Sequence, residues 1–159
     1  MSTTALNEVA VVQTSFPSPL KSWEAVRDEK RAEQLSRIPA LWRLQPSQFP
    51  VKGAVDLRPL AAASGILTER ELEITGEKYD ATSLAAEVSK GIFTATETVT
   101  AFCKRAAICQ QLCNALTEIF FSDAIEKAKK LDDYFKETGK TVGPLHGLPM
   151  TFKVHSKTL

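Results

Sequence analysis

The side chains of this sequence that could do chemistry gather in two short segments. The first holds the three cysteines of the chain, Cys103, Cys109 and Cys113. The second, residues 143–155, holds both histidines and a lysine between them: His146, Lys153 and His155. Thiolates and imidazoles bind zinc and also form Cys–His nucleophilic pairs, whereas a lysine amine acts as a base only when it is neutral. The residues around the two segments decide among these chemistries.

The setting of the cysteines favours packing over catalysis or metal binding. On paper, Cys109 and Cys113 lie four residues apart and could complete a zinc site with the two histidines. All three cysteines, however, fall on the apolar stripe of a predicted helix, where free cysteine behaves as a small hydrophobic side chain. A reactive cysteine needs a partly exposed, electropositive pocket, which nothing in the sequence indicates. We therefore expect no metal ion or other cofactor.

Composition and charge argue against several classes of partner. The chain has 159 residues, enough for one domain, with the 43% hydrophobic and 25% charged content of an ordinary globular protein. Its formal net charge is +1, so nothing electrostatic favours a nucleic acid or an anionic membrane. The apolar runs are too short to span a bilayer, and residues 1–8 lack the features of a secretory signal. An odd, crowded set of cysteines makes no disulfide framework, which favours a reducing, cytoplasmic location.

The amino-terminal part is predicted to comprise a lead-in, a helix and an arm. Residues 1–19 are expected to be a flexible lead-in, because they mix serine, threonine and proline. Residues 20–60 hold a polar helix over Leu20–Ile38, ended by Pro39, and then a proline-interrupted extended arm. The candidate inward positions of the helix are Trp23, Val26, Leu35 and Ile38. Its charged surface is interpreted as a solvated face, with packing on a partner subunit as the alternative.

Residues 61–159 are predicted to form the main body, in which cap signals open four helices. Capping boxes at Thr68–Glu71 and Thr94–Glu97 open a helix over Glu69–Ile74 and the longest helix, respectively. Asp80 caps a helix running to Lys90, and Asp123 caps the last helix. Apolar residues recur at helical spacing along the longest helix. The last helix has one apolar face and ends at Gly139.

Two segments of this body are predicted to be strands. Leu116–Phe121 is an apolar run consistent with a buried strand. Leu148–His155 alternates apolar and polar side chains, with Pro149 where a strand tolerates proline. Two strands separated by one helix indicate the opening of a parallel sheet, so the expected fold class is α/β. Such a sheet needs further strands to cover both faces, and we expect it to be incomplete here.

The segment Gly143–Lys153, with the sequence GPLHGLPMTFK, resembles the first signature block of the amidase signature family. In that family a turn of the pattern G-P-L-H-G-[LIV]-P leads into a strand that ends in a lysine. Residues 23–44, 67–75 and 101–121 also resemble the amino-terminal region of fungal acetamidase-type enzymes. The resemblance implies the helix-rich amino-terminal part of an α/β/α fold with a mixed sheet. It makes residues 61–159 the truncated start of a catalytic domain.

The chemistry implied by the resemblance is amide hydrolysis by a serine, a second serine in a cis peptide bond and a lysine, without a cofactor. Lys153 is the catalytic residue that carries over. A free lysine titrates near ~10.4, so it serves as a base only where burial disfavours its charged form. Judged from the residues alone, Lys153 is a solvated lysine on an edge strand. His146 is expected to make a structural hydrogen bond within the turn, and His155 is assigned no role.

The serines that Lys153 would serve are not found in this sequence. The later family block is a Gly/Ser-rich run with adjacent serines, and the chain contains neither a Ser-Ser nor a Gly-Gly pair. The match also stops after Lys153, where the family continues with aspartate and this chain with Val154. A truncation, a frame change or a misread splice junction would each produce this pattern. We therefore expect Lys153 to be exposed and protonated, and the chain alone to be inactive.

Two functional hypotheses follow from this pattern. As a complete family member, the protein would hydrolyse the C–N bond of small carboxamides to a carboxylate and ammonia, with the small amide as its partner. The alternative is a non-catalytic remnant or an interaction module, because an unpaired apolar strand is a template for association. Neither hypothesis calls for a nucleic acid or a membrane, and a homodimer is compatible with both.

Overall fold

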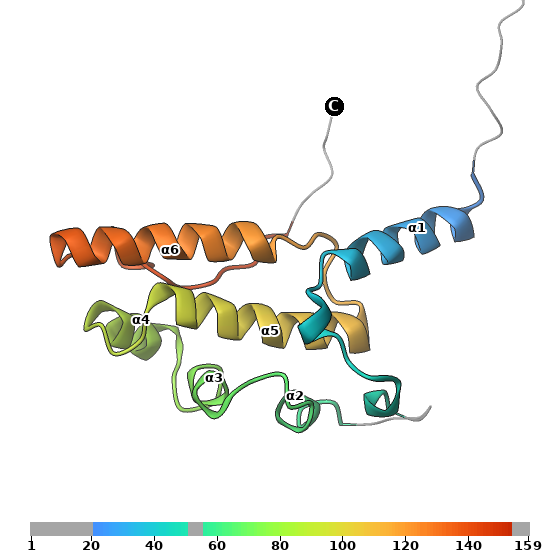
Figure 1. The fold of residues 1–159 in the computed structure, drawn as a ribbon, viewed down its shortest axis with the longest axis horizontal. Coiled ribbons are helices and arrows are strands. Elements are labelled where there is room, and N and C mark those ends of the chain that lie inside the picture. The colour runs from blue at the N-terminus through green and yellow to red at the C-terminus, as the bar shows by residue number, and fades with distance from the viewer. Residues whose placement is uncertain (1–20, 51–55, 154–159) are drawn as a thin grey trace, which may run out of the picture.

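A computed structural model describes residues 21–50 and 56–153 of the chain. This part consists of α-helices and two short 3-10 helices joined by irregular connections (Figure 1). In chain order the elements are α1 (Trp23–Ser36), η1 (Ala40–Trp42), η2 (Pro46–Gln48), α2 (Leu60–Ala63), α3 (Glu69–Ile74), α4 (Ala81–Ser89), α5 (Ala95–Cys113) and α6 (Phe121–Thr138). The predicted lead-in, residues 1–19, lies outside the described residues.

The two longest helices, α5 and α6, lie side by side and run in opposite directions, with α6 on the side of α5 away from α2 and α3 (Figure 1). Their shared face is apolar and lies within the first core cluster, to which Ile38 after α1 and Ile119 of the connection before α6 also belong. The residues that the two helices contribute are Ala95, Val99, Cys103, Ala107, Phe121 and Ala128. Each large apolar side chain buried in this way stabilises the fold by roughly 1.5–3 kcal/mol. The α5–α6 pair is therefore the platform on which the other elements rest.

The shorter helices cover another face of α5. Ile74 of α3, Leu84 and Val88 of α4 and Phe93 pack together with Ala101 in a second cluster. Nearer the carboxyl end of α5, a third cluster joins Ile108 to residues of the arm and of the segment before α3. Because α5 is covered on two faces, it organises the whole described body.

The cap signals of three helices are confirmed. Thr68 and Thr94 each accept a hydrogen bond from the amide three residues on, and the glutamate at that position bonds back to the cap amide. Asp80 caps α4 through the Ser83 amide at 2.7 Å. These signals were readable because each acts within four residues of the chain.

The first helix is placed differently from the prediction. Of its four predicted inward positions only Ile38 is buried, and the prediction is wrong for the others: Trp23, Val26 and Leu35 are exposed. Contact with the body runs through a polar side chain instead, because Gln34 Nε2 donates to the carbonyls of Leu116 and Thr117 at 2.9 Å. Only the carboxyl-terminal part of α1 therefore meets the body, which periodicity alone cannot reveal.

The predicted strand over Leu116–Phe121 is wrong, because residues 114–120 form an irregular connection between α5 and α6. A strand needs a neighbouring strand to take its backbone hydrogen bonds. Here side chains take them: the Leu116 amide donates to Gln110 Oε1 at 2.6 Å, and Arg37 donates to the Ile119 carbonyl at 3.1 Å. The last helix accordingly begins at Phe121, with Phe120 as its cap residue, and not after Asp123.

The second predicted strand, Leu148–His155, is not formed over residues 148–153, and its remaining residues lie outside the described part. Within residues 21–50 and 56–153 there is no strand with which it could pair. The described part of the chain is thus helical, and the sheet expected for an α/β fold is absent from it. Among the described helices, none is long and apolar enough to cross a membrane.

Candidate active-site segment

The glycine-proline block forms two successive turns after α6. The His146 amide donates to the Gly143 carbonyl at 3.1 Å, and the Leu148 amide donates to the Leu145 carbonyl at 3.1 Å. Gly147 adopts a φ of 75°, in the left-handed region where a residue with a Cβ is strained. Residues 143–148 therefore form the turn that the family pattern implies, without the strand predicted to follow it.

The turn is pressed against the junction of α4 and α5. A Cβ placed on Gly147 would lie 2.9 Å from the Ala95 Cβ and 3.1 Å from Val88 Cγ1. Such distances are shorter than van der Waals contact, so both space and backbone conformation demand glycine here. The next residue, Leu148, packs into the cluster of α3, α4 and α5. The block is thereby fixed to the body at two adjacent residues.

His146 is buried in this turn, with 5% of its surface exposed. Its Nδ1 accepts a hydrogen bond from the Val142 amide at 3.3 Å, and its ring lies 6.0 Å from that of Phe135 on α6. Because Nδ1 is the acceptor, the neutral ring carries its hydrogen on Nε2. The predicted structural hydrogen bond within the loop is confirmed.

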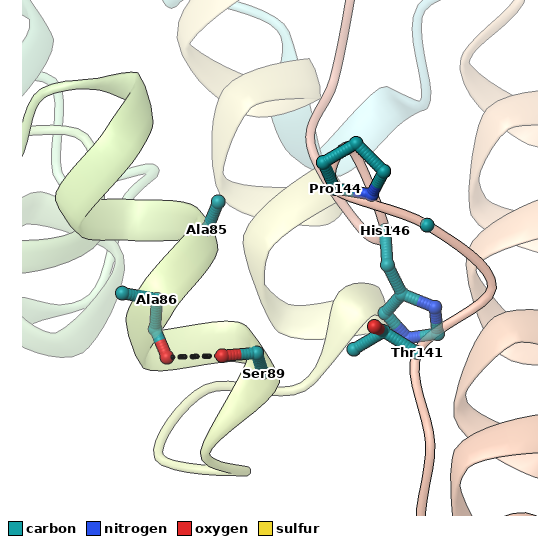
Figure 2. A pocket seen from close by; sticks show the side chains of 7 residues that line it. Ala85, Ala86, Ser89, Thr141, Pro144 and His146 are labelled. Carbon is teal, nitrogen blue, oxygen red and sulfur yellow. Dashed lines mark hydrogen bonds between the residues drawn. The ribbon is translucent and has the colours of Figure 1, made fainter.

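A shallow hollow of about 220 Å³ lies between this turn and α4. Figure 2 shows Ala85, Ala86 and Ser89 of α4 on one side, with the loop residues Thr141, Pro144 and His146 on the other. The Ser89 hydroxyl donates to the Ala86 carbonyl at 2.8 Å, as the dashed line marks. That hydroxyl is held by its own helix and is not paired with a base.

The amino terminus of α5, beneath the turn, is capped by a carboxylate from α6. Asp132 accepts from the Ala95 amide at 2.7 Å and from the Thr96 amide at 3.0 Å. The first amides of a helix have no partner within the helix, and a negative charge there also interacts favourably with the helix dipole. Local spacing does not reveal Asp132 as a cap, because it lies more than 35 residues from the amides that it caps. It ties α6 to the helix end on which Gly147 rests.

The predicted catalytic residue, Lys153, is exposed, as are Met150 and Phe152 before it. The expected exposure of Lys153 is confirmed. Leu148 is the last residue of the block that packs into the body, so the lysine lies five residues beyond that anchor. The turn thus fixes where the segment leaves the body but does not by itself bury the amine.

The cysteines differ from one another in their surroundings. Cys103 is buried, and burial raises the pKa of its thiol to about 11. Cys109 and Cys113 are exposed, so the prediction that all three lie on the apolar stripe of α5 is wrong for these two. The apolar stripe shifts at the carboxyl end of α5, where Ile108 and Gln110 are the buried positions.

The zinc arrangement considered from the sequence does not come together in the described residues. Cys109 and Cys113 lie near the carboxyl end of α5, whereas the turn with His146 packs on its amino end at Ala95. The second histidine, His155, lies outside the described part. Among the described residues, no three His, Cys, Asp or Glu side chains are close enough together to hold a metal ion.

Comparison with known proteins adds to this geometry. Residues 97–158 match the profile of the amidase family. An amidase of Gibberella moniliformis is 46% identical over 141 residues, and the acetamidase of Emericella nidulans is 41% identical over 133 residues. These alignments cover 86% and 84% of this chain but 26% and 23% of the two relatives. The chain therefore spans about a quarter of the length of the curated relatives that it matches.

A solved structure agrees with these matches. Fatty acid amide hydrolase resembles this chain with a TM-score of 0.59 and 29% sequence identity, over 80% of this chain and 22% of that one. The helical arrangement around α5 and α6 is thus shared with part of a much longer hydrolase. The chain is thus similar to the amidase family, and among the relatives that it resembles are fungal amidases and acetamidases.

Proposed function

We propose that this chain supplies the first part of the body of an acetamidase-like enzyme, one that hydrolyses small carboxamides to a carboxylate and ammonia. The observation that carries the proposal is the anchored turn. Gly147 and Leu148 fix the block to α4 and α5, so the position at which the segment toward Lys153 leaves the body is determined. The match to fungal acetamidases over most of the chain supports the choice of substrate class.

In the proposed mechanism Lys153 is the base of a serine–serine–lysine set. The neutral amine takes the proton of the nucleophilic serine through a bridging serine, and the serine oxygen attacks the amide carbonyl. Backbone amides hold the oxyanion that forms. A lysine can do this only where burial lowers its pKa, so the segment 148–153 would become a covered strand of a mixed sheet in the complete enzyme. The serines, lysine and backbone donors need no cofactor.

The chain alone is expected to be inactive, because Lys153 is exposed and the sequence has no adjacent serines. Purified chain should release no ammonia from acetamide or from longer amides above the rate of a Lys153→Ala variant. Ammonia release that depends on Lys153 would contradict this expectation. We propose a cytoplasmic location for the protein, which fractionation of cells expressing the tagged chain would test.

A complementation experiment tests the assignment of Lys153 directly. The chain is co-expressed with the part of Emericella nidulans acetamidase that follows the region matched here, and acetamide hydrolysis is measured. We expect the wild-type chain to restore hydrolysis and Lys153→Met to abolish it. Lys129→Met, at an exposed position on α6, is the matched control and should behave as wild type. Equal activity of the two variants would remove Lys153 from the mechanism.

A second proposal, an interaction module without catalysis, rests on the apolar surface of the same segment. Val142, Leu145, Met150 and Phe152 are between 55% and 79% exposed. Exposed apolar side chains that follow one another in this way are typical of surfaces covered by another polypeptide. Size-exclusion chromatography with light scattering distinguishes the cases: a homodimer or larger assembly supports this proposal, and a monomer at all concentrations removes its support.

A further inference from the structure

The carboxyl end of α5 carries two exposed thiols that neither proposal uses. Cys109 and Cys113 lie on one side of the helix, four residues apart, and Cys113 is its last residue. Both are free and exposed, in contrast to the buried Cys103. Residues four apart on a helix are direct neighbours, with Cβ atoms about 5–6 Å from each other. The structure thus brings together the only two exposed thiols of the described residues.

The thiols interact with one another. Burial raises the pKa of the Cys109 thiol, and the neighbouring Cys113 side chain raises it further. Two neighbouring thiols on one side of a helix, both open to solvent, are an arrangement from which a disulfide forms when an oxidant reaches them.

The backbone allows the bond. Four residues along an α-helix separate two Cα atoms by roughly 6 Å, which lies within the usual range for disulfides. The Cβ atoms must approach to about 4 Å, so the last turn has to adjust by one or two ångströms. The adjustment is confined to this last turn, because the next residue, Asn114, is already left-handed at a φ of 51° and the connection after it is irregular up to Phe121.

We propose that Cys109 and Cys113 form a reversible intrahelical disulfide, a modification site whose substrate is a small peroxide. One thiolate attacks a peroxide oxygen and becomes a sulfenic acid, releasing water from hydrogen peroxide. The second thiol then attacks the sulfenic sulfur, the S–S bond forms and a second molecule of water leaves. The two sulfurs lose two electrons and two protons, the peroxide is reduced to two waters, and a dithiol reverses the reaction.

The disulfide would form next to the side-chain hydrogen bonds that attach α1 to the body. Gln110 lies between the two cysteines in sequence and is buried. It donates to Gln34 of α1 at 3.2 Å and to Asn114 at 3.0 Å, and it accepts from the Leu116 amide at 2.6 Å. An adjustment of the last turn of α5 moves the backbone that carries these bonds. Disulfide formation is therefore expected to loosen the attachment of α1.

Intact-mass measurement of the reduced 159-residue chain after brief exposure to hydrogen peroxide tests the proposal. We expect a loss of about 2 Da that dithiothreitol reverses. Trypsin cleaves after Lys104 and Arg105, so Cys103 falls in a different peptide and the bond must map to the peptide that contains Cys109 and Cys113. Cys103→Ser should oxidise as wild type does, and Cys109→Ser and Cys113→Ser should each lose the 2 Da change.

The alternatives give different products. A linkage to Cys103, a disulfide between two chains on a non-reducing gel, or only a gain of oxygen atoms without loss of hydrogen would each overturn the proposal. Labelling with iodoacetamide under native conditions provides a second measurement. Two of the three cysteines should react in the reduced chain and neither of the exposed pair after oxidation, whereas labelling of both after oxidation would contradict the bond.

Discussion

The two ends of α5 are held by different means. At the amino end, the helix amides are capped by Thr94, the residue directly before α5, and by Asp132 of α6. The turn at Gly147 packs against Ala95, the first residue of α5. At the carboxyl end the contacts come from long amide side chains, above all Gln34 and Gln110, and two thiols lie open to solvent. The amino end of α5 is tightly fixed, and the glycine-proline block of residues 143–153 packs on it. The carboxyl end is held through side chains that can rearrange.

This difference has a physical cause. Helix caps and a glycine turn leave the backbone few alternative conformations. Each cap bonds directly to helix amides, and the turn packs where there is no room for a larger residue. A glutamine side chain has several rotamers, so hydrogen bonds made through it fix the neighbouring segment less closely than bonds made directly by the backbone. The comparison suggests that substitutions at the amino end cost more stability than substitutions of exposed groups elsewhere.

The largest effect is expected at Gly147. Gly147→Val adds a strained left-handed residue and a clash with Ala95, and we expect it to lower the free energy of unfolding by about 2–4 kcal/mol. Urea unfolding followed by circular dichroism measures this change. Gly143→Ala is the matched control, because nothing lies within 4 Å of a Cβ at that position. Equal stability of the two variants would show that the turn is not pressed against α5 in solution.

A smaller loss is expected when the cap from α6 is removed. Asp132→Ala leaves the Ala95 and Thr96 amides without their carboxylate, and we expect a loss of about 1–3 kcal/mol in the free energy of unfolding. Asp133→Ala, at the next residue and exposed, is the control and should change stability by less than about 0.5 kcal/mol. Equal losses in the two variants would show that the Asp132 carboxylate does not hold the amino end of α5.

A pH-dependent effect is expected at Glu71, which pairs with Lys104 at 2.7 Å. Burial alone would raise the pKa of Glu71, but hydrogen bonds from Lys104 and from the Thr68 amide outweigh it and lower the pKa below the ordinary value of 4.5. A carboxyl with a lowered pKa stabilises the fold above its ordinary pKa, and that contribution is lost as the pH falls through the folded-state value.

Urea unfolding at neutral pH and near pH ~3.5 checks the sign of this effect. The wild-type chain should lose more stability on acidification than Glu71→Gln, which has no proton to gain. Glu77→Gln, at an exposed position after α3, should follow the wild type. A Glu71→Gln variant that loses as much stability as the wild type would show that the ion pair makes no contribution.

The smallest effect is expected at Lys153. Because this side chain is exposed, Lys153→Met should change the free energy of unfolding by less than about 0.5 kcal/mol. Lys104→Met removes the partner of a largely buried carboxylate and should cost more, about 1–3 kcal/mol. A stability loss at Lys153 comparable to that at Lys104 would mean that the lysine has a structural role, and its assignment as a catalytic base would then need revision.

Much of the helical body could be predicted, because its signals are local. The helix over Glu69–Ile74 was predicted with its observed bounds, and the turn at Gly143–Gly147 was expected from the resemblance of its block to the family pattern. The strand over Leu116–Phe121 was not formed, because an apolar run specifies burial and not a hydrogen-bonding partner. The exposure of Cys109 could not be predicted, since it depends on which neighbours cover each face of α5.

The sequence by itself determined where α3, α4 and α5 begin and that residues 143–153 carry a glycine-proline block resembling that of amidases, because these features depend on residues within a few positions of one another. Only the tertiary structure decided which end of α1 meets the body, that Asp132 caps a helix far from it in sequence and that two thiols stand exposed side by side. The reason is that contacts between distant segments depend on how whole elements pack, and local spacing does not specify that packing.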